Sequence, residues 1–298
     1  MYGLFAKDIP LITLHAHAKI NLGLRIIGTL PDGYHAIHSL FLPIYDLFDT
    51  LTFENHDTDI IFISNDHLNI PMEQNLIVKS AHLMRKHFGI EKGAIIHLDK
   101  VIPSGAGLGG GSSDAAATFI GLSKLWEITT DITTLSKLGL SLGSDIPFFF
   151  HDSPAIVEGK GEVITPISCD LHAWLLFIFP GIHINTAWAY SQIQEYSDYA
   201  SIHLESVFQN GSINLQSELL VNDFEKPIHA IHPILNDIKL QLISSGALTS
   251  LMSGSGSTMY GIFSEESTAQ TAKSAFEQYQ TLLIPIQLNY NPIREELS

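Results

Sequence analysis

The chain has 298 residues, 45% hydrophobic and 15% charged, which is enough apolar material for one large or two ordinary globular domains. Its net charge of −16 excludes a general attraction to nucleic acid or to an anionic membrane, so a polyanionic ligand would need local donors. The single cysteine, Cys169, excludes an internal disulfide and a multi-cysteine metal site, and the 15 histidines show no metal-binding spacing. We expect a soluble, cytoplasmic protein.

The first 90 residues alternate between predicted strands and one predicted helix. Residues 11–27 give two strand-like pieces interrupted at 18–21, where Lys19 lies in an apolar run. Lys19 is either a functional residue or an edge-strand lysine whose ammonium reaches solvent. The Pro-Asp-Gly sequence within 31–35 predicts a turn. Strands are predicted at 41–53 and 58–63, and a helix at 75–88 that Asn75 could cap.

A glycine-rich loop dominates the middle of the chain. Five glycines fall between a predicted strand at 93–98 and a helix at 115–126, with the cap-type residues Ser112, Ser113 and Asp114 between loop and helix. A glycine loop that leads into a helix N-terminus favours the binding of phosphate, because the unpaired N–H groups and the helix dipole attract anions.

Other interpretations of this loop fit less well. The glycines formally satisfy the dinucleotide pattern G-x-G-x-x-G, with Glu127 as a ribose partner, but the strand ends several residues too early. No Gly-Lys-Ser/Thr follows, which excludes a P-loop, and a flexible linker would not pass straight into an amphipathic helix. The sequence therefore predicts a serine-rich anion loop without a lysine.

Asp145 lies between a glycine turn and the wholly apolar residues 146–150, after a predicted helix at 132–142. We expect its carboxylate to be partly desolvated. It could simply cap a backbone turn, or it could serve as a positioned base if a lysine lies near it.

The second half begins with a predicted hairpin at 155–165 and a buried strand at 174–179. We place a domain boundary near residue 166, which gives domains 1–166 and 167–298. Helices are predicted at 186–196, 233–244 and 267–279. The small-residue loop 252–258 lies between strands at 247–251 and 260–263, and we interpret it as a ligand-binding loop rather than a connecting turn.

Six motifs carry a resemblance to a known family. They are residues 18–22, 32–35, 103–113, 142–148, 222–225 and 252–256. In order and spacing they resemble the 4-diphosphocytidyl-2-C-methyl-D-erythritol kinases, which belong to the superfamily of galactokinase, homoserine kinase and mevalonate kinase. The resemblance implies an α+β two-domain fold with a ligand cleft between the domains. It also implies ATP-dependent phosphorylation of the substrate's 2-hydroxyl in the non-mevalonate route to isoprenoid precursors.

The same resemblance implies residue roles. Asp145 would take the hydroxyl proton and Lys19 would support the reacting groups. The residues expected at ATP are Pro103, Ser104, Gly105, Ala106, Gly107, Leu108, Gly109, Gly110, Gly111, Ser112, Ser113, Lys100 and Asn75. The residues expected at the substrate are Asn21, Tyr34, His35, Tyr190, Ser253, Gly254, Ser255 and Gly256. Magnesium is expected with ATP, although no protein ligand for it is identified.

Two alternatives stay open at this point: another small-molecule kinase of the superfamily, and a non-catalytic nucleotide-binding module. The chain also departs from many members of the family, which carry basic residues before Asp-Gly-Tyr-His where this chain has Gly28 to Pro31. We therefore expect weaker electrostatic capture of the substrate.

Overall fold

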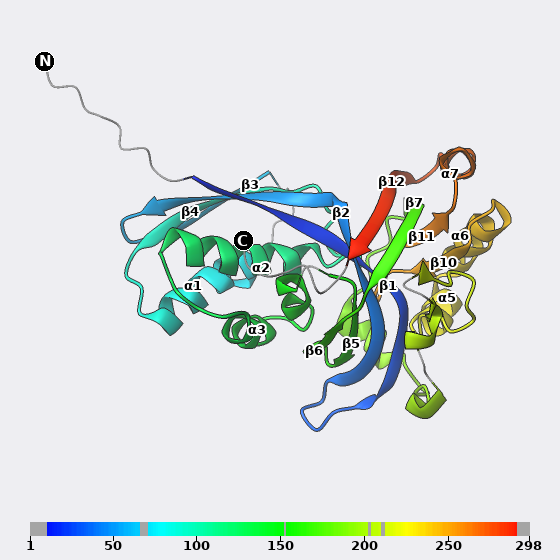
Figure 1. Ribbon diagram of the computed structural model, residues 1–298, viewed down its shortest axis with the longest axis horizontal. Helices are drawn as coiled ribbons and strands as arrows, with labels where there is room; N and C mark the ends of the chain where they lie inside the picture. The colour runs from blue at the N-terminus through cyan, green and yellow to red at the C-terminus, as the bar shows by residue number, and fades with distance from the viewer. Residues whose placement is uncertain (1–10, 66–70, 152, 202–203, 210–211, 291–298) are drawn as a thin grey trace, which may run out of the picture. The chain divides into compact units, whose positions relative to one another are not determined.

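The structure is a computed structural model that describes residues 11–65, 71–151, 153–201, 204–209 and 212–290 (Figure 1). The chain divides into two compact units. Unit 1 contains the residues up to Ala18, Leu47–Ile102 and Gly110–Phe150, and unit 2 contains Lys19–Asp46, Pro103–Gly109 and the residues from His151 onward. Because each unit collects separate stretches of chain, the linear boundary near residue 166 stays a prediction.

The long strands β1 (Ile12–Thr29) and β2 (His35–His56) pair with each other and contribute to both units. The predicted interruption of the first strand at 18–21 is wrong, because β1 runs through it. Lys19 and Asn21 tolerate burial there since they hydrogen-bond to each other. The predicted turn before β2 is confirmed, with Gly33 at φ +86° and its N–H donating to the carbonyl of Leu30.

Unit 1 is a sheet covered by helices (Figure 1). The strand β3 (Ile60–Ser64) is parallel to β4 (Gly93–Asp99), and β4 is antiparallel to residues 50–56 of β2. The helices α1 (Leu76–Phe88), α2 (Gly110–Leu125) and α3 (Ile132–Leu140) lie along this sheet. Two short 3-10 helices complete the unit, η1 (Met72–Gln74) and η2 (Ile146–Phe150).

Local sequence explains the ends of α1. Asn75 accepts a hydrogen bond from the Ile77 N–H at 2.8 Å, and Gly89 closes the helix with φ +65°. The N-cap that the sequence indicated is therefore confirmed.

The strand β7 (Cys169–Phe179) organises unit 2, because it pairs with β11 (Met259–Phe263) and with β12 (Gln280–Tyr290). The strand β10 (Thr249–Met252) extends the sheet from β11. A hairpin of β5 (Ala155–Gly159) and β6 (Val163–Pro166) pairs with residues 37–41 of β2. The short strands are β8 (Phe208–Gln209) and β9 (Ser212–Ile213).

The helices of unit 2 are α4 (Thr186–Ser191), α5 (Glu225–Ile231), α6 (Pro233–Ser244) and α7 (Glu266–Lys273), with the 3-10 turns η3 (Tyr199–Ser201), η4 (Leu204–Val207) and η5 (Ser274–Phe276). The first predicted helix of this half ends five residues early, at Ser191. Sequence periodicity missed α5 and the whole of β12. In the described part of the chain, no helix is long and apolar enough to cross a membrane.

Candidate active site

The glycine loop bends sharply and then leads directly into a helix. Gly105, Gly107 and Gly109 all have positive φ, between 69° and 77°. The helix α2 begins at Gly110, so the predicted start at residue 115 is wrong, and Ser112 and Ser113 lie in the first turn. The first N–H groups of α2 therefore come from the serine- and glycine-rich segment itself, which is the arrangement that binds anions at helix N-termini.

Gly107 packs directly against the loop 252–258, within unit 2. A Cβ atom at Gly107 would collide with the carbonyl oxygen of Ser253. The Ser253 hydroxyl donates to the Gly107 carbonyl at 2.9 Å. The two small-residue loops, far apart in the sequence, are thus held backbone to backbone.

Lys19 is buried, with only 3% of its surface exposed. The interpretation as a snorkelling edge-strand lysine is therefore wrong. Its Nζ donates to Asn21 Oδ1 at 2.7 Å and lies 4.4 Å from the centroid of the Phe41 ring. Its backbone N–H donates to the Leu108 carbonyl at 2.9 Å, which ties β1 to the glycine loop.

Asn21 orients Lys19 and is itself fixed from two sides. Its Nδ2 donates to Ser39 Oγ at 3.0 Å, and Ser39 Oγ donates onward to the Gly23 carbonyl at 2.7 Å. The hydroxyl of Tyr260, a fully buried residue of β11, donates to the Asn21 carbonyl at 2.8 Å. A predicted contact of Asn21 with the substrate stays a prediction.

Asp145 belongs to unit 1, whereas Lys19 belongs to unit 2. It is half-buried and directly precedes η2, whose five residues are all buried. The structure therefore shows the partial burial that the sequence led us to expect. Its role as a proton acceptor stays a prediction.

Lys100, a predicted ATP ligand, lies in a buried charge cluster of unit 1. Its Nζ donates to Asp49 Oδ2 at 2.5 Å and to Asp114 Oδ2 at 2.8 Å. Asp49 is fully buried, and its Oδ1 also accepts the N–H groups of Val101 and Ile102. Burial raises the pKa of Asp114 to about 7, and the neighbouring Asp49 carboxylate acts in the same direction against the attraction of Lys100. Burial by itself lowers the pKa of Lys100, but the two carboxylates outweigh it and raise that pKa overall.

This cluster lies beside the first turn of α2. A Cβ atom at Gly110 would lie 2.9 Å from both Lys100 Nζ and Ile102 Cγ2, so a larger residue there would displace these side chains. Asn75, the other predicted ATP contact in unit 1, uses its Oδ1 to cap α1. Contact of Lys100 or Asn75 with ATP stays a prediction.

The predicted substrate aromatics gather in unit 2. The rings of His35 and Tyr190 stack with centroids 4.5 Å apart and an interplanar angle of 15°. Phe224 supports Tyr190 in an edge-on contact at 4.9 Å. Tyr34 is 54% exposed, as a residue that stacks on a ligand would be.

Lys160, on the β5–β6 turn, is a residue that sequence reasoning missed. Its Nζ lies 4.7 Å from the centroid of the Tyr34 ring and 3.0 Å from Asp32 Oδ2. It places a positive charge next to the Asp-Gly-Tyr-His motif, where the local sequence has none. Only the pairing of β5 with β2 brings it there, and the Gly-Lys-Gly sequence of the turn gave no hint of this.

The loop 252–258 uses several of its hydroxyl groups to hold its own shape. Ser255 Oγ lies 3.0 Å from Thr186 Oγ1, and Ser257 Oγ donates to the Ile182 carbonyl. The side-chain amide of Asn222 donates to two backbone carbonyls of the loop, those of Met252 and Gly254. Binding of a ligand by Ser253, Gly254, Ser255 or Gly256 stays a prediction.

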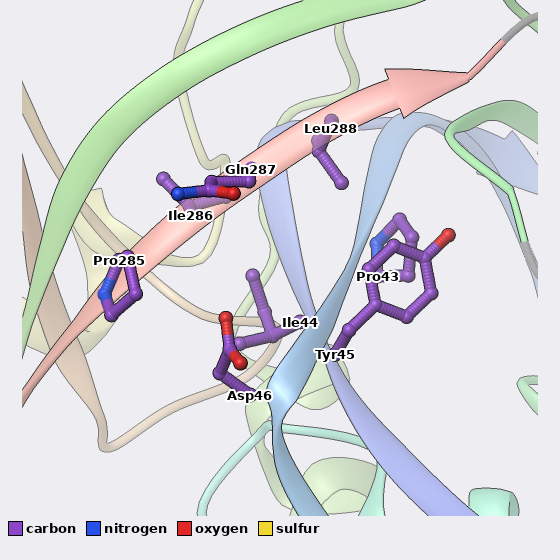
Figure 2. Close-up of a pocket in the computed structure, with 8 residues that line it drawn as sticks. All are labelled: Pro43, Ile44, Tyr45, Asp46, Pro285, Ile286, Gln287 and Leu288. Atoms are coloured by element: carbon purple, nitrogen blue, oxygen red, sulfur yellow. The ribbon is translucent and has the colours of Figure 1, made fainter.

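A small hollow in unit 2 lies apart from these residues (Figure 2). It is lined by residues 43–46 of β2 and 285–288 of β12, and its volume is about 10 Å³. That is room for about one water molecule. No predicted site residue lines it, so we do not assign it to the active site.

Comparisons with known proteins identify the family. The model of the GHMP kinase N-terminal domain matches residues 75–153, and the model of the GHMP kinase C-terminal domain matches residues 204–281. Together the matches cover more than half of the chain.

The chain belongs to the GHMP kinase family.

Relatives within the family share one name. A 4-diphosphocytidyl-2-C-methyl-D-erythritol kinase of Thermodesulfovibrio yellowstonii is 41% identical over 290 residues, which cover 93% of this chain and 100% of the relative. A kinase of the same name from Chlorobium chlorochromatii is 37% identical over 91% of this chain and 95% of the relative. The resemblance seen in the sequence motifs is thereby confirmed.

Solved structures confirm the predicted α+β two-domain kinase fold. A crystal structure of 4-(cytidine 5'-diphospho)-2C-methyl-D-erythritol kinase, 30% identical, has a TM-score of 0.78 and covers 93% of this chain and 99% of its own. Homoserine kinase from Cytophaga hutchinsonii, only 16% identical, has a TM-score of 0.65 over 97% of this chain and 98% of its own, and shows the shared fold alone.

Each of the two GHMP kinase matches contains part of the candidate site. The N-terminal match contains the glycine loop, α2 and Asp145, and the C-terminal match contains Asn222 and the loop 252–258. Lys19, Tyr34 and His35 precede both matches. Among the described residues, no group of three or more His, Cys, Asp or Glu side chains could hold a metal ion.

Proposed function

We propose that this GHMP kinase transfers the γ-phosphoryl group of ATP to the 2-hydroxyl of 4-diphosphocytidyl-2-C-methyl-D-erythritol, in the non-mevalonate route to isoprenoid precursors. The observation that carries the proposal is the 41% identity, over 93% of the chain, to a relative named for that substrate. A cytoplasmic location and magnesium as the metal are part of the proposal.

The reaction needs a proton acceptor and a cation. We assign the first role to Asp145, which takes the proton as the substrate oxygen forms its bond to the γ-phosphorus and the bond to the β-phosphate oxygen breaks. We assign the second role to Lys19, whose fixed ammonium stabilises the charge on the transferring group. A magnesium ion on the phosphates would neutralise part of their charge.

ATP would be held by the glycine loop and the start of α2. The N–H groups of Gly110, Gly111, Ser112 and Ser113 face away from the helix at its N-terminus and suit an anion. The remaining loop residues, with Lys100 and Asn75, complete the proposed ATP site. The Lys100 cluster gives its residues a fixed geometry beside the first turn of α2.

The acceptor would be held by residues of unit 2. Tyr34 would stack on the cytosine ring and His35 would bind its polar edge, with Tyr190 stacked on His35. Asn21 and the loop residues 253–256 would contact the rest of the substrate. Lys160 supports this assignment because it supplies a cation beside Tyr34 for an anionic substrate.

A second candidate is a kinase for another small alcohol. The fold supports it, since a homoserine kinase and a mevalonate kinase superpose with TM-scores of 0.65 and 0.66. Their identities of 16% and 15% are far below that of the relatives named for the cytidyl substrate, so this candidate ranks second.

The test is coupled ADP release from the purified protein with ATP, magnesium and one acceptor at a time. We expect turnover with the cytidyl substrate that depends on the acceptor and falls by at least about 10²-fold in Asp145→Asn, as for loss of a general base. Turnover with homoserine or mevalonate alone would support the second candidate. Full activity of Asp145→Asn would keep the kinase but remove Asp145 as the base. ATP binding without turnover on any acceptor would support a non-catalytic nucleotide-binding module.

A further inference from the structure

Asn222 is a buried polar residue to which the proposed mechanism gives no role. Only 1% of its surface is exposed. Its backbone is fixed against β1, since the Leu24 N–H donates to the Val221 carbonyl at 2.8 Å and the Asp223 N–H donates to the Leu24 carbonyl at 2.9 Å. Asn222 is therefore anchored before its side chain makes any contact.

The side-chain amide of Asn222 makes three hydrogen bonds. Its Nδ2 donates to the carbonyls of Met252 and Gly254, at 2.7 and 2.8 Å, and its Oδ1 accepts the Phe224 N–H at 3.0 Å. This pattern needs two donors and one acceptor on one short side chain. Aspartate has no donor when ionised, and leucine has neither donor nor acceptor.

The two carbonyls that Asn222 binds flank Ser253. The Ser253 hydroxyl donates to the Gly107 carbonyl at 2.9 Å, and the next residue of the glycine loop, Leu108, accepts the Lys19 N–H. Hydrogen bonds thus run from Asn222 through Ser253 to the glycine loop and to the strand that carries Lys19. All of these residues belong to unit 2.

A neighbouring carboxylate fixes the same loop at its first residue. Glu225 Oε1 accepts the Met252 N–H at 2.7 Å, and Glu225 Oε2 accepts from Lys239 Nζ. The beginning of the loop 252–258 is therefore held by a backbone N–H and by two carbonyls. Ser253 is also held within the loop, since its N–H donates to the Thr258 carbonyl at 2.9 Å and its carbonyl accepts the Gly256 N–H at 3.0 Å. Asn222 adds to this by fixing the carbonyls on either side of Ser253.

We propose that Asn222 is a positioning residue that fixes the glycine loop for ATP through Ser253. The inference deepens the proposed function, since it assigns the geometry of the ATP site, but it can be measured by nucleotide binding without any acceptor. Asn222 acts through Ser253 and Gly107 and does not touch the reacting atoms.

The test compares Asn222→Asp with Asn214→Asp. Both variants add the same charge in unit 2, but Asn214 is exposed and its Oδ1 accepts an N–H, which a carboxylate also does. We expect Asn222→Asp to weaken ATP binding by at least about 10-fold, because it places a carboxylate against two carbonyls, and Asn214→Asp to leave it unchanged. In turnover, the KM for ATP should rise more than kcat falls. Equal ATP affinity for the parent and Asn222→Asp would overturn the proposal.

Serine variants keep the proposal testable if Asn222→Asp does not fold. Ser253→Ala should weaken ATP binding, whereas Ser244→Ala, which removes an exposed hydroxyl bonded to the Gln241 carbonyl, should not.

The double variant Asn222→Asp/Ser253→Ala should bind ATP about as well as Asn222→Asp alone, since both changes break the same series of hydrogen bonds between Asn222 and the glycine loop. Equal effects of Ser253→Ala and Ser244→Ala, or strictly additive effects in the double variant, would contradict the inference. If the parent turns over the cytidyl substrate and Asn222→Asp binds ATP as tightly as the parent, only this inference is overturned. If the parent shows no turnover but Asn222→Asp binds ATP more weakly than the parent, only the proposed function is overturned.

Discussion

The ammonium of Lys19 donates to the neutral side chain of Asn21, at 2.7 Å from Oδ1, and both side chains are buried. A carboxylate at the position of this amide would add a negative charge beside the ammonium that we propose stabilises the transferring phosphoryl group. The choice of an amide therefore matters for chemistry as well as for burial.

Asn21→Asp should lower kcat by at least about 10-fold while the protein stays folded, because it places a negative charge beside the Lys19 ammonium and weakens the attraction of that ammonium for the phosphoryl group. The measurement is kcat at saturating ATP and acceptor, with circular dichroism as the control for folding. An unchanged kcat in the folded variant would mean that Lys19 does not act through its charge.

Lys160→Met should raise the KM for the acceptor about 2- to 5-fold and leave kcat nearly unchanged. The change removes a cation over Tyr34 and leaves Asp32 to repel an anionic substrate, and the effect is small because solvent screens exposed charges. The matched control is Lys226→Met, which removes an exposed lysine 3.5 Å from Glu195 in the same unit. Equal effects of the two variants would assign the change to net charge and not to Lys160.

Gly107→Ala should both destabilise the protein and weaken ATP binding. Gly107 has φ +77°, and a Cβ there would collide with the Ser253 carbonyl. Gly89 has φ +65° with open space around it, so Gly89→Ala should cost only the backbone strain of about 1 to 2 kcal/mol. Denaturant unfolding and ATP titration of both variants separate the effect of the positive φ from the effect of the collision with the Ser253 carbonyl. Identical losses would show that the contact between the two loops is not tight.

Asp114→Asn should change how stability depends on pH. Burial raises the pKa of Asp114 to about 7, against about 3.9 in an unfolded chain. Between these values the folded protein binds a proton that the unfolded chain releases, so the free energy of unfolding of the parent falls as pH rises. Asparagine does not titrate. The variant should therefore gain stability relative to the parent from pH 4 to 7, by at most about 4 kcal/mol, since one pKa unit corresponds to about 1.4 kcal/mol.

Asp131→Asn is the control for that pH dependence. A backbone hydrogen bond from Thr134 lowers the pKa of the exposed Asp131, so its contribution is lost only as pH falls below the usual carboxylate range. Its difference curve should be flat between pH 5 and 7. A flat curve for Asp114→Asn over the same window would contradict the raised pKa.

Local sequence patterns were sufficient for much of the fold. Asn75 and Gly89 mark the ends of α1, and Gly33 marks the turn before β2, because capping and positive φ depend on single residues. The strand β12 was missed although its buried residues Ile284, Ile286 and Leu288 alternate with Pro285 and Gln287, and its pairing with β7 comes from a distant part of the chain. The start of α2 was placed too late because glycines are poor helix formers, yet the first turn tolerates them beside Lys100.

Sequence reasoning identified site residues only where they lie together in one short segment of the chain. The glycine loop and the motif around Lys19 are local, and the structure ties them together through Leu108. The contacts of Lys160 and Asn222 could not be predicted, although Asn222 lies in the motif 222–225, because their partners lie 126 to 128 and 30 to 32 residues away and only the fold brings them together. Asp49 and Asp114 were missed for the same reason, since neither one looks unusual without Lys100 between them.

The most direct measurement identifies the product after the protein is incubated with ATP, magnesium and 4-diphosphocytidyl-2-C-methyl-D-erythritol. Phosphorus NMR and mass spectrometry would identify it. The proposed function predicts one ADP for each new phosphomonoester, with the phosphoryl group on the 2-hydroxyl and the cytidyl diphosphate intact. Release of ADP without a phosphorylated acceptor, or a phosphoryl group at any other position, would contradict it.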